Sequence, residues 1–121
     1  MREHNGENTP LILVVDDDTV MRMLAHTSLA REGYRVKEAE NGAEALSLLN
    51  ALKPDLILLD VMMPELDGFS TVKEIRKTSR VPVIMLSARG EEYDRIHGFE
   101  LGVDDYVVKP FGVMELLSRI K

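Results

Sequence analysis

The sequence predicts an α/β domain in which a doubly wound, five-stranded parallel sheet carries helices on both faces. Short apolar runs alternate with stretches of helical periodicity over most of the 121 residues. Most of the runs are continuously apolar, which is typical of strands buried on both faces. Several runs also end in polar residues suited to chemistry, at the edge of the sheet where parallel α/β proteins bind ligands.

The composition narrows the class of protein. Hydrophobic residues make up 45% of the chain, which can therefore form a core as a single domain. The net charge of -6 argues against a nucleic-acid surface in this segment. There is no cysteine, so disulfides and thiolate metal sites are excluded. No apolar run approaches the roughly 20 residues that span a bilayer, so we expect a cytoplasmic protein without membrane contact.

The first strand–helix unit follows residues 1–10, whose polar character predicts a flexible N-terminal tail. The apolar run 11–15 predicts a strand, and it leads directly into three consecutive aspartates. A helix over 19–32 should follow, with Asp18 as its cap and Gly33 as its stop. The expected buried face of this helix is Met21, Leu24, Ala25 and Leu29.

The second unit begins with residues 35–39, whose alternation of polar and apolar residues predicts an edge strand. Asn41 and Glu44 have the spacing of a capping box at the start of a helix. The expected buried stripe of that helix is Ala45, Leu48, Leu49 and Leu52.

The third unit contains the central strand. Pro54 precedes the apolar run 56–59, which ends in Asp60. Pro64 prevents the strand from continuing, because proline cannot donate to a strand ladder. Helical spacing returns over 69–76.

The fourth unit is a strand over 81–86 that ends in Ser87, followed by a helix with a weaker pattern over 91–101. We expect Ile96 and Phe99 to anchor this helix in the core.

A fifth strand over 106–108 ends in Lys109, and an amphipathic helix over 113–120 follows. Right-handed crossovers leave few topologies, of which the doubly wound order 2-1-3-4-5 is favoured. This order puts the polar strand 35–39 at one edge of the sheet. Its switch point lies between the first and third strands, whose ends carry Asp16, Asp17 and Asp60.

These strand ends supply the parts of a phosphoryl-transfer site. Three neighbouring carboxylates repel one another, and a hard cation such as Mg²⁺ relieves the repulsion. The Asp60 carboxylate can attack phosphorus as a nucleophile. Lys109 and Ser87 can hold phosphoryl oxygens through a positive charge and a hydroxyl group.

Each of these side chains also has a structural interpretation. Aspartates such as Asp16 and Asp17 often cap helices, and we interpret Asp18 in this way. Lysine is common at exposed sheet edges, and serine is common in turns. The functional interpretation is favoured for the other residues because the complete set occurs together.

Four motifs occur in order from Leu11 to the C-terminus: Asp16-Asp17-Asp18, Asp60-Val-Met-Met63-Pro64, Ser87-Ala88-Arg89 and Lys109-Pro110-Phe111. In this order and spacing they resemble the receiver domain of bacterial two-component response regulators. The resemblance implies a flavodoxin-like (βα)5 domain over residues 11–121. It also implies a signalling switch, rather than a conventional enzyme, that accepts a phosphoryl group from a sensor histidine kinase.

The resemblance assigns a role to each site residue. Asp60 would be the phosphoacceptor and would also be one of the Mg²⁺ ligands. Asp17 would bind the metal directly, Asp16 through metal-bound water, and Met62 through its main-chain carbonyl. Ser87 and Lys109 would hold the phosphoryl oxygens, and the bond between Lys109 and Pro110 is expected to be cis.

The resemblance also implies a switch made of Ser87 and Tyr106. Ser87 should move toward the phosphoryl oxygens, and Tyr106 should then turn inward. This movement would reshape the surface formed by the fourth helix, the fifth strand and the fifth helix. Met62 and Arg89 differ from the commoner residues of the family at two positions that would flank the path of a water molecule attacking the phosphoryl group.

The segments 91–95, 102–106 and 115–119 resemble regulators that carry a winged-helix DNA-binding domain after the receiver. No such domain is present in this chain, so DNA would be bound only through that absent part. The subfamily implies homodimers upon phosphorylation. The expected interface pairs Arg95 with Glu115, and Asp105 or Asp104 with Arg119, with apolar contact from Phe99 and Leu117.

Two other function classes remain open on the residues alone. The same topology can bind a flavin cofactor, although an acidic loop repels a phosphate unless a metal intervenes. The domain could also be an interaction module that is independent of phosphorylation. The intact set of site residues argues against that second alternative.

Overall fold

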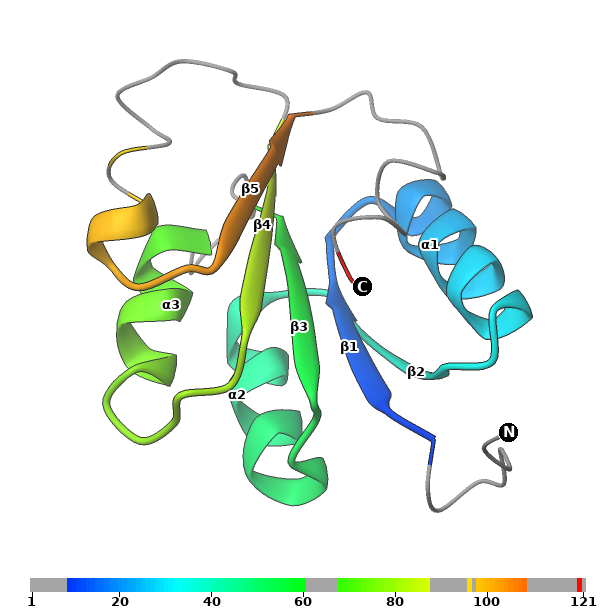
Figure 1. Ribbon diagram of the computed structural model, residues 1–121, viewed down its shortest axis with the longest axis horizontal. Helices are drawn as coiled ribbons and strands as arrows, with labels where there is room; N and C mark the ends of the chain where they lie inside the picture. Colours follow the sequence, from blue (N-terminus) through cyan, green and yellow to red (C-terminus); the bar gives the residue numbers. More distant parts are fainter. Residues whose placement is uncertain (1–8, 61–67, 88–95, 97, 109–119, 121) are drawn as a thin grey trace.

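The computed structural model describes residues 9–60, 68–87, 96, 98–108 and 120, and its main element is a parallel sheet (Figure 1). The sheet has five strands in the order β2-β1-β3-β4-β5, and all adjacent pairs are parallel. This confirms the predicted fold class and strand order. The strands are β1 (Leu11–Val15), β2 (Arg35–Ala39), β3 (Leu56–Asp60), β4 (Val83–Ser87) and β5 (Asp105–Val108).

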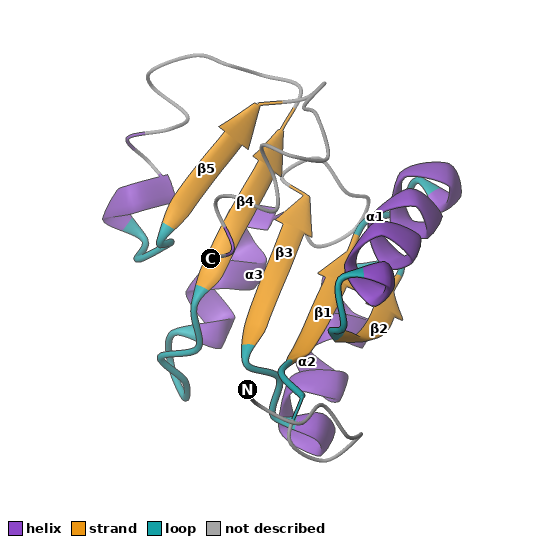
Figure 2. Cartoon of the chain, turned by 45° about the vertical axis from the view of Figure 1, so that its right-hand side comes forward, coloured by secondary structure: helices purple, strands orange, loops and turns teal. Residues whose placement is uncertain are grey.

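Helices cover both faces of the sheet (Figure 2). Helix α1 (Thr19–Arg31) lies on one face, and α2 (Gly42–Leu52) and α3 (Gly68–Ile75) lie on the other. Residues 96 and 98–100, which precede β5, are also helical. Among the described residues, none of the helices combines the length and the apolar character needed to cross a membrane.

Two hydrophobic clusters, one on each face, form the core. Successive residues of a strand point to opposite faces, so each apolar run contributes to both clusters. In β1, Leu13 and Val15 belong to the cluster under α2 and α3, whereas Ile12 and Val14 belong to the cluster under α1. Double-sided burial of this kind explains why the central strands are continuously apolar.

Aspartates that precede β3 and β5 hold the amino ends of the neighbouring strands β1 and β4. The Asp55 carboxylate accepts a hydrogen bond of 2.8 Å from the backbone amide of Leu11. The Asp104 carboxylate accepts one of the same length from the amide of Val83. Each bond satisfies a backbone donor at the start of a strand, where unpaired donors are costly.

The last two residues of the predicted N-terminal tail pack against β2. Thr9 is buried, and its carbonyl oxygen accepts a hydrogen bond of 2.9 Å from Nε of Arg35. The carbonyl oxygen of Pro10 accepts a bond from the backbone amide of Arg35.

The predicted helix signals are confirmed at three termini. Asp18 caps α1 by accepting bonds from the amides of Val20 and Met21, and Gly33 follows α1 with a φ of 98°. Asn41 caps α2 through a bond of 2.8 Å from the amide of Glu44.

Predicted core positions in α1 and in the helix before β5 are wrong. Leu24 in α1 is 57% exposed, and Ile96 and Phe99 are 51% and 45% exposed. In α1 the residues facing the sheet are Arg22, Ala25 and Leu29, and Leu24 lies two residues from Arg22, on another side of the helix.

Ile96 and Phe99 point away from the core because Gly98 is the residue that faces it. A Cβ atom at Gly98 would lie 3.4 Å from Met85, Val103 and Tyr106. The helix approaches the sheet closely at Gly98, with room for no more than a Cβ atom, and this orientation leaves its large side chains outside.

Smaller differences occur at the ends of elements. Leu52 in the last turn of α2 is 38% exposed, although it was expected in the buried stripe. The fourth strand begins at Val83 rather than 81, and the fifth begins at Asp105 rather than 106. Residues 91–95 and 113–119 of the two remaining predicted helices lie outside the described residues.

Candidate functional site

Three carboxylates gather at the carboxyl end of the sheet, as predicted. Oxygen atoms of Asp16, Asp17 and Asp60 all lie within 4.8 Å of one another. We call these three residues the acidic cluster. Asp16 and Asp60 are only 2% and 4% exposed, whereas Asp17 is exposed.

Strand pairing brings the cluster together. β1 and β3 are neighbours in register, with Val15 beside Leu59. The residues that follow this pair are Asp16 and Asp60, so the two carboxylates emerge side by side. Asp16 and Asp60 are more than 40 residues apart in the sequence, and the parallel pairing of β1 and β3 makes them neighbours in space.

The loop after β1 is held by hydrogen bonds to β2 and within the loop itself. The backbone amide of Asp16 donates to the carbonyl oxygen of Ala39, at 3.1 Å, which ties the loop to the end of β2. The Asp16 carboxylate accepts a bond of 2.9 Å from the amide of Asp18. Asp18 then caps α1, so it has a structural role rather than a place in the cluster.

The donor atoms of the cluster fit a hard divalent cation. All three are carboxylate oxygens, which Mg²⁺ and Ca²⁺ prefer. Two of the carboxylates are buried, and like charges held this close in a poorly solvated place repel one another. A cation would offset that repulsion, and the exposed Asp17 leaves one side of the cluster open to solvent.

Arg22 lies beside the cluster, although the sequence did not point to it. Its Nη1 donates a buried hydrogen bond of 2.7 Å to the carbonyl oxygen of Asp16. Its Nε donates to the carboxylate of Glu38 at 2.9 Å, and Nδ1 of His26 contacts the other oxygen of Glu38. A signal was present, because Arg22, Ala25 and Leu29 have the spacing of a buried helix face.

These contacts change the acidity of Glu38. Burial alone would raise its pKa. The hydrogen bonds from His26 and Arg22 act in the opposite direction, and the pKa of Glu38 lies below its usual value of 4.5. The carboxylate is therefore held in its charged form.

The other predicted site residues lie partly within the described chain. Ser87 ends β4. The residue before it, Leu86, is paired with Asp60, so the main chain of Ser87 lies near the acidic cluster. Tyr106 lies opposite Met85 in β5 and is already buried, at 4% exposure. The remaining predicted residues lie outside the described part: Met62, Arg95, Lys109, Glu115, Leu117 and Arg119.

Three predicted dimer residues are described. Phe99 is exposed, as an interface residue requires. The Asp104 carboxylate accepts a bond from Val83 and lies 3.4 Å from Nη2 of Arg76, so it has partners within the chain. Asp105 accepts a bond from the amide of its neighbour Tyr106.

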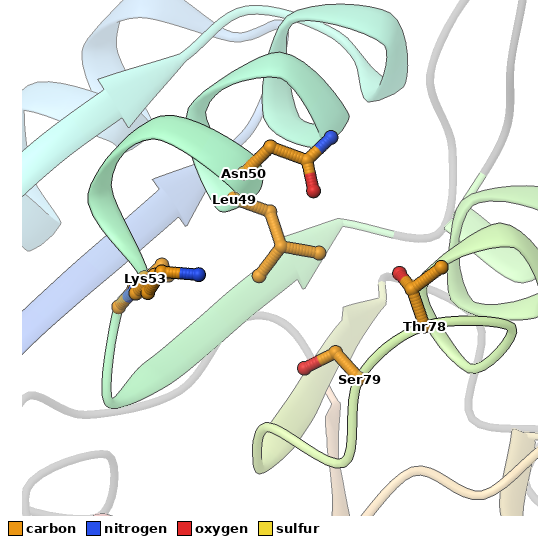
Figure 3. A pocket seen from close by; sticks show the side chains of 6 residues that line it. Leu49, Asn50, Lys53, Thr78 and Ser79 are labelled. Atoms are coloured by element: carbon orange, nitrogen blue, oxygen red, sulfur yellow. The ribbon is translucent and has the colours of Figure 1, made fainter.

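A separate cavity lies at the opposite end of the sheet (Figure 3). It has a volume of about 240 Å³ and lies between the end of α2 and the segment after α3. Ligand pockets usually have volumes of about 300–1,000 Å³, so this cavity is small for a ligand site. Its lining residues are Leu49, Asn50, Lys53, Pro54, Thr78 and Ser79.

The family described as the response regulator receiver domain matches residues 12–121. This chain belongs to that family. The resemblance noted from the motifs is therefore confirmed, and the acidic cluster lies where the motifs of this receiver domain placed it.

Known relatives and solved structures support the same family assignment. The chain is 56% identical over 110 residues to the transcriptional regulatory protein CpxR homolog of Haemophilus influenzae, covering 91% of this chain and 48% of that protein. The receiver domain of the Francisella response regulator 1452 superposes with a TM-score of 0.88 and 41% identity, over 93% of each chain. The BeF3-activated N-terminal receiver domain of Klebsiella pneumoniae RstA gives 0.87 and 29%, over 91% of this chain and 94% of that one.

The chain spans about half the length of the curated relatives it matches. Several of those relatives are named as transcriptional regulators.

Proposed function

We propose that this receiver domain accepts one phosphoryl group on Asp60, in the presence of Mg²⁺, and that phosphorylation controls an output surface. The observation that carries the proposal is the acidic cluster, in which the buried Asp60 carboxylate lies within 4.8 Å of two others. Membership in the response regulator family supports the same reaction.

The reaction is a displacement at phosphorus. An oxygen of Asp60 forms a bond to phosphorus while the bond from phosphorus to the donor's leaving group breaks, and the leaving group keeps the bonding electrons. The donor would be a phosphohistidine of a sensor kinase. A bound divalent cation would offset negative charge on the phosphoryl oxygens and on the attacking carboxylate.

The protein contributes mainly position. Asp60 is fixed at the end of the central strand β3, between β1 and β4, and cannot move far without disturbing the sheet. Asp17 and Asp16 would hold Mg²⁺, together with the carbonyl of Met62. Ser87 and Lys109 would hold the phosphoryl oxygens, as the motifs imply.

The output would pass through Ser87 and Tyr106. Tyr106 is buried against the core, and the proposed switch would keep its side chain inward when the phosphoryl group is present. The reshaped surface would favour a homodimer, and its interface would consist of Arg95, Phe99, Asp105 or Asp104, Glu115, Leu117 and Arg119. DNA would be bound by a separate C-terminal winged-helix domain of a longer regulator.

The central test is the intact mass of the protein after incubation with acetyl phosphate and Mg²⁺. Wild type should gain one acid-labile phosphoryl group, and Asp60→Asn should gain none. The matched control is Asp18→Asn, which changes an aspartate of the same loop outside the cluster and should still be phosphorylated. Equal phosphorylation of Asp60→Asn and wild type would refute the assignment.

A flavin-binding function has less support. The loop after β1 carries two carboxylates of the acidic cluster, and these would repel the phosphate of a flavin nucleotide. A purified protein that retained a yellow cofactor would favour this alternative over the phosphorylation switch.

A further inference from the structure

Arg22 is buried although it carries a guanidinium group. It is 8% exposed, and it lies on the side of α1 that faces the sheet, as Leu29 does. Buried arginines are rare unless their charge is paired and their donors are satisfied. The partners of Arg22 therefore indicate what the residue does.

The guanidinium group of Arg22 donates hydrogen bonds to two partners, one in the loop of the acidic cluster and one in the sheet. Nη1 donates to the main-chain carbonyl of Asp16 at 2.7 Å, in a buried bond. Nε donates to the carboxylate of Glu38 on β2 at 2.9 Å. The guanidinium thus joins the loop that carries two members of the acidic cluster to the neighbouring edge strand.

The same peptide segment is fixed from its other side. The Asp16 amide donates to the carbonyl oxygen of Ala39 at 3.1 Å, so both main-chain polar groups of Asp16 are held. The Asp16 carboxylate also accepts from the amide of Asp18. Arg22 supplies the hydrogen bond that fixes the carbonyl, and the orientation of that peptide helps set where Asp16 and Asp17 point.

The positive charge of Arg22 lies close to the proposed cation site, so it needs a counterion that keeps it from binding the carboxylates of the acidic cluster. An unpaired guanidinium could bind a carboxylate of the cluster and compete with a metal ion. Glu38 prevents this by holding Nε. The charged form of Glu38 is secured by a second contact, from His26 to its other oxygen.

Glu40 offers a comparison within the same strand end. Its carboxylate lies 4.0 Å from Nη2 of Arg22, and its side chain is 69% exposed. Exposed ion pairs at this distance contribute little. Glu38 and Glu40 therefore carry the same charge near the site, but only Glu38 forms a close hydrogen-bonded ion pair with Arg22.

We propose that Arg22 is a positioning residue for the divalent-cation site: it holds the main chain of Asp16, while Glu38 keeps its guanidinium away from the carboxylates. This inference rests on the proposed magnesium site. It concerns cation affinity and loop geometry, and Arg22 itself is not expected to touch the phosphoryl group.

The first experiment measures Mg²⁺ affinity by calorimetry in wild type, Arg22→Met and Arg22→Lys. Loss of a partner that orients a metal ligand typically weakens metal affinity by roughly 10–100-fold, and we expect Arg22→Met near the lower end. Arg22→Lys should lose less Mg²⁺ affinity. An ammonium group can donate to the Asp16 carbonyl, but it lacks the planar fork of donors that lets a guanidinium bind Glu38 at the same time. Arg22→Lys also keeps the proposal testable if Arg22→Met does not fold.

Arg76→Met is the matched control. The side chain of Arg76 is also largely buried, and it donates to the main-chain carbonyls of Gly102 and Val81 at the opposite end of the sheet. This variant should be less stable than wild type yet bind Mg²⁺ equally well. Wild-type affinity in Arg22→Met, or equal losses in Arg22→Met and Arg76→Met, would overturn the positioning role.

The second experiment tests the role of Glu38 with Glu38→Gln, Glu40→Gln and the double variant Arg22→Met/Glu38→Gln. Glu38→Gln should weaken Mg²⁺ binding more than Glu40→Gln does. Adding Glu38→Gln to Arg22→Met should cause little further loss, because the two residues act through one contact. Additive losses, or equal effects of the two glutamates, would show that Glu38 does not act through Arg22.

A measurement without metal separates this inference from the proposed function. Hydrogen exchange at the Asp18 amide, which donates to Asp16, should be faster in metal-free Arg22→Met than in wild type or Arg76→Met. If wild type bound no Mg²⁺, the proposed function would fail, and this exchange rate would still decide the positioning role. Unchanged exchange at Asp18 in Arg22→Met would overturn it.

Discussion

Arg76 donates two hydrogen bonds to the main-chain carbonyl of Gly102, from Nε at 3.1 Å and from Nη2 at 2.7 Å. Its Nη1 donates to the carbonyl of Val81 at 2.8 Å. Gly102 precedes β5 and Val81 precedes β4, so one side chain just after α3 joins the segments that lead into two neighbouring strands.

Arg76→Met should therefore destabilise the domain. Hydrogen bonds from charged donors contribute about 1.5–3 kcal/mol each, and the bond to Val81 is partly buried whereas those to Gly102 are exposed, so we expect a loss of about 2–3 kcal/mol. Urea denaturation measures the loss. Arg80→Met changes a more exposed arginine four residues later and should stay within about 0.5 kcal/mol of wild type. Equal effects of the two substitutions would contradict the assignment.

Two glycines near α3 and β5 should respond oppositely to alanine. A Cβ at Gly98 would make contacts of 3.4 Å, which are ordinary van der Waals distances, and the residue is helical. Gly98→Ala should then stabilise the fold by up to about 1 kcal/mol. Gly102 has a φ of 98°, and a Cβ there would lie 3.1 Å from Nε of Arg76.

Gly102→Ala should accordingly destabilise the fold by about 1–3 kcal/mol through backbone strain. Denaturation midpoints of the two variants give the comparison. Destabilisation of similar size in both would mean that the helix before β5 lacks the space seen at Gly98.

Mg²⁺ should raise the thermal stability of wild type but not that of Asp17→Asn. A ligand that binds only the folded state stabilises it by about 2.7 kcal/mol at one hundred times its dissociation constant. Without Mg²⁺, Asp17→Asn should be slightly more stable than wild type, because one of three repelling charges is gone.

Asp18→Asn is the control for this metal response. Asparagine caps helices as well as aspartate does, so this variant should keep both its stability and its response to Mg²⁺. Thermal unfolding of the three proteins with and without Mg²⁺ tests the prediction. A full Mg²⁺ response in Asp17→Asn would remove that residue from the proposed metal site.

Glu38 should make stability depend on pH in acid. Burial raises its pKa, but the contacts with His26 and Arg22 lower it to below the usual value of 4.5. A carboxylate whose pKa is lowered by folding contributes stability that is fully present above its unfolded pKa and is lost as the pH falls through its folded pKa. Glu38→Gln cannot titrate and should lack this loss.

The difference in unfolding free energy between wild type and Glu38→Gln should therefore be largest near neutral pH and should shrink below pH 4.5. Urea denaturation at a series of pH values measures this difference. A difference that stays constant across the series would contradict the charged contact between Glu38 and its partners.

The sheet and the acidic cluster could be predicted because both depend on short stretches of sequence. A run such as 56–59 is buried on both faces wherever it lies in a parallel sheet. The carboxyl ends of parallel strands meet at one edge, so Asp16, Asp17 and Asp60 could be brought together without coordinates.

The faces of the helices were harder to predict, because burial there depends on what lies opposite. Leu24 was expected in the core, yet Arg22 faces the sheet instead, since Glu38 on β2 and the Asp16 carbonyl offer it partners. Those partners are 16 and 6 residues away in sequence, and only the tertiary fold shows that they coincide. The same limit applies to Phe99, whose exposure follows from the close approach of Gly98.

The strand order has a consequence for the assembly of the domain during synthesis. β1 pairs with β2 on one side and β3 on the other, and both partners follow it in the chain. One edge of the apolar strand β1 therefore stays unpaired during synthesis until residues 56–60 have been made and can form β3. The like charges of Asp16 and Asp60 meet only at that docking step, so cations in the surroundings would ease the closure of the sheet as well as any later chemistry.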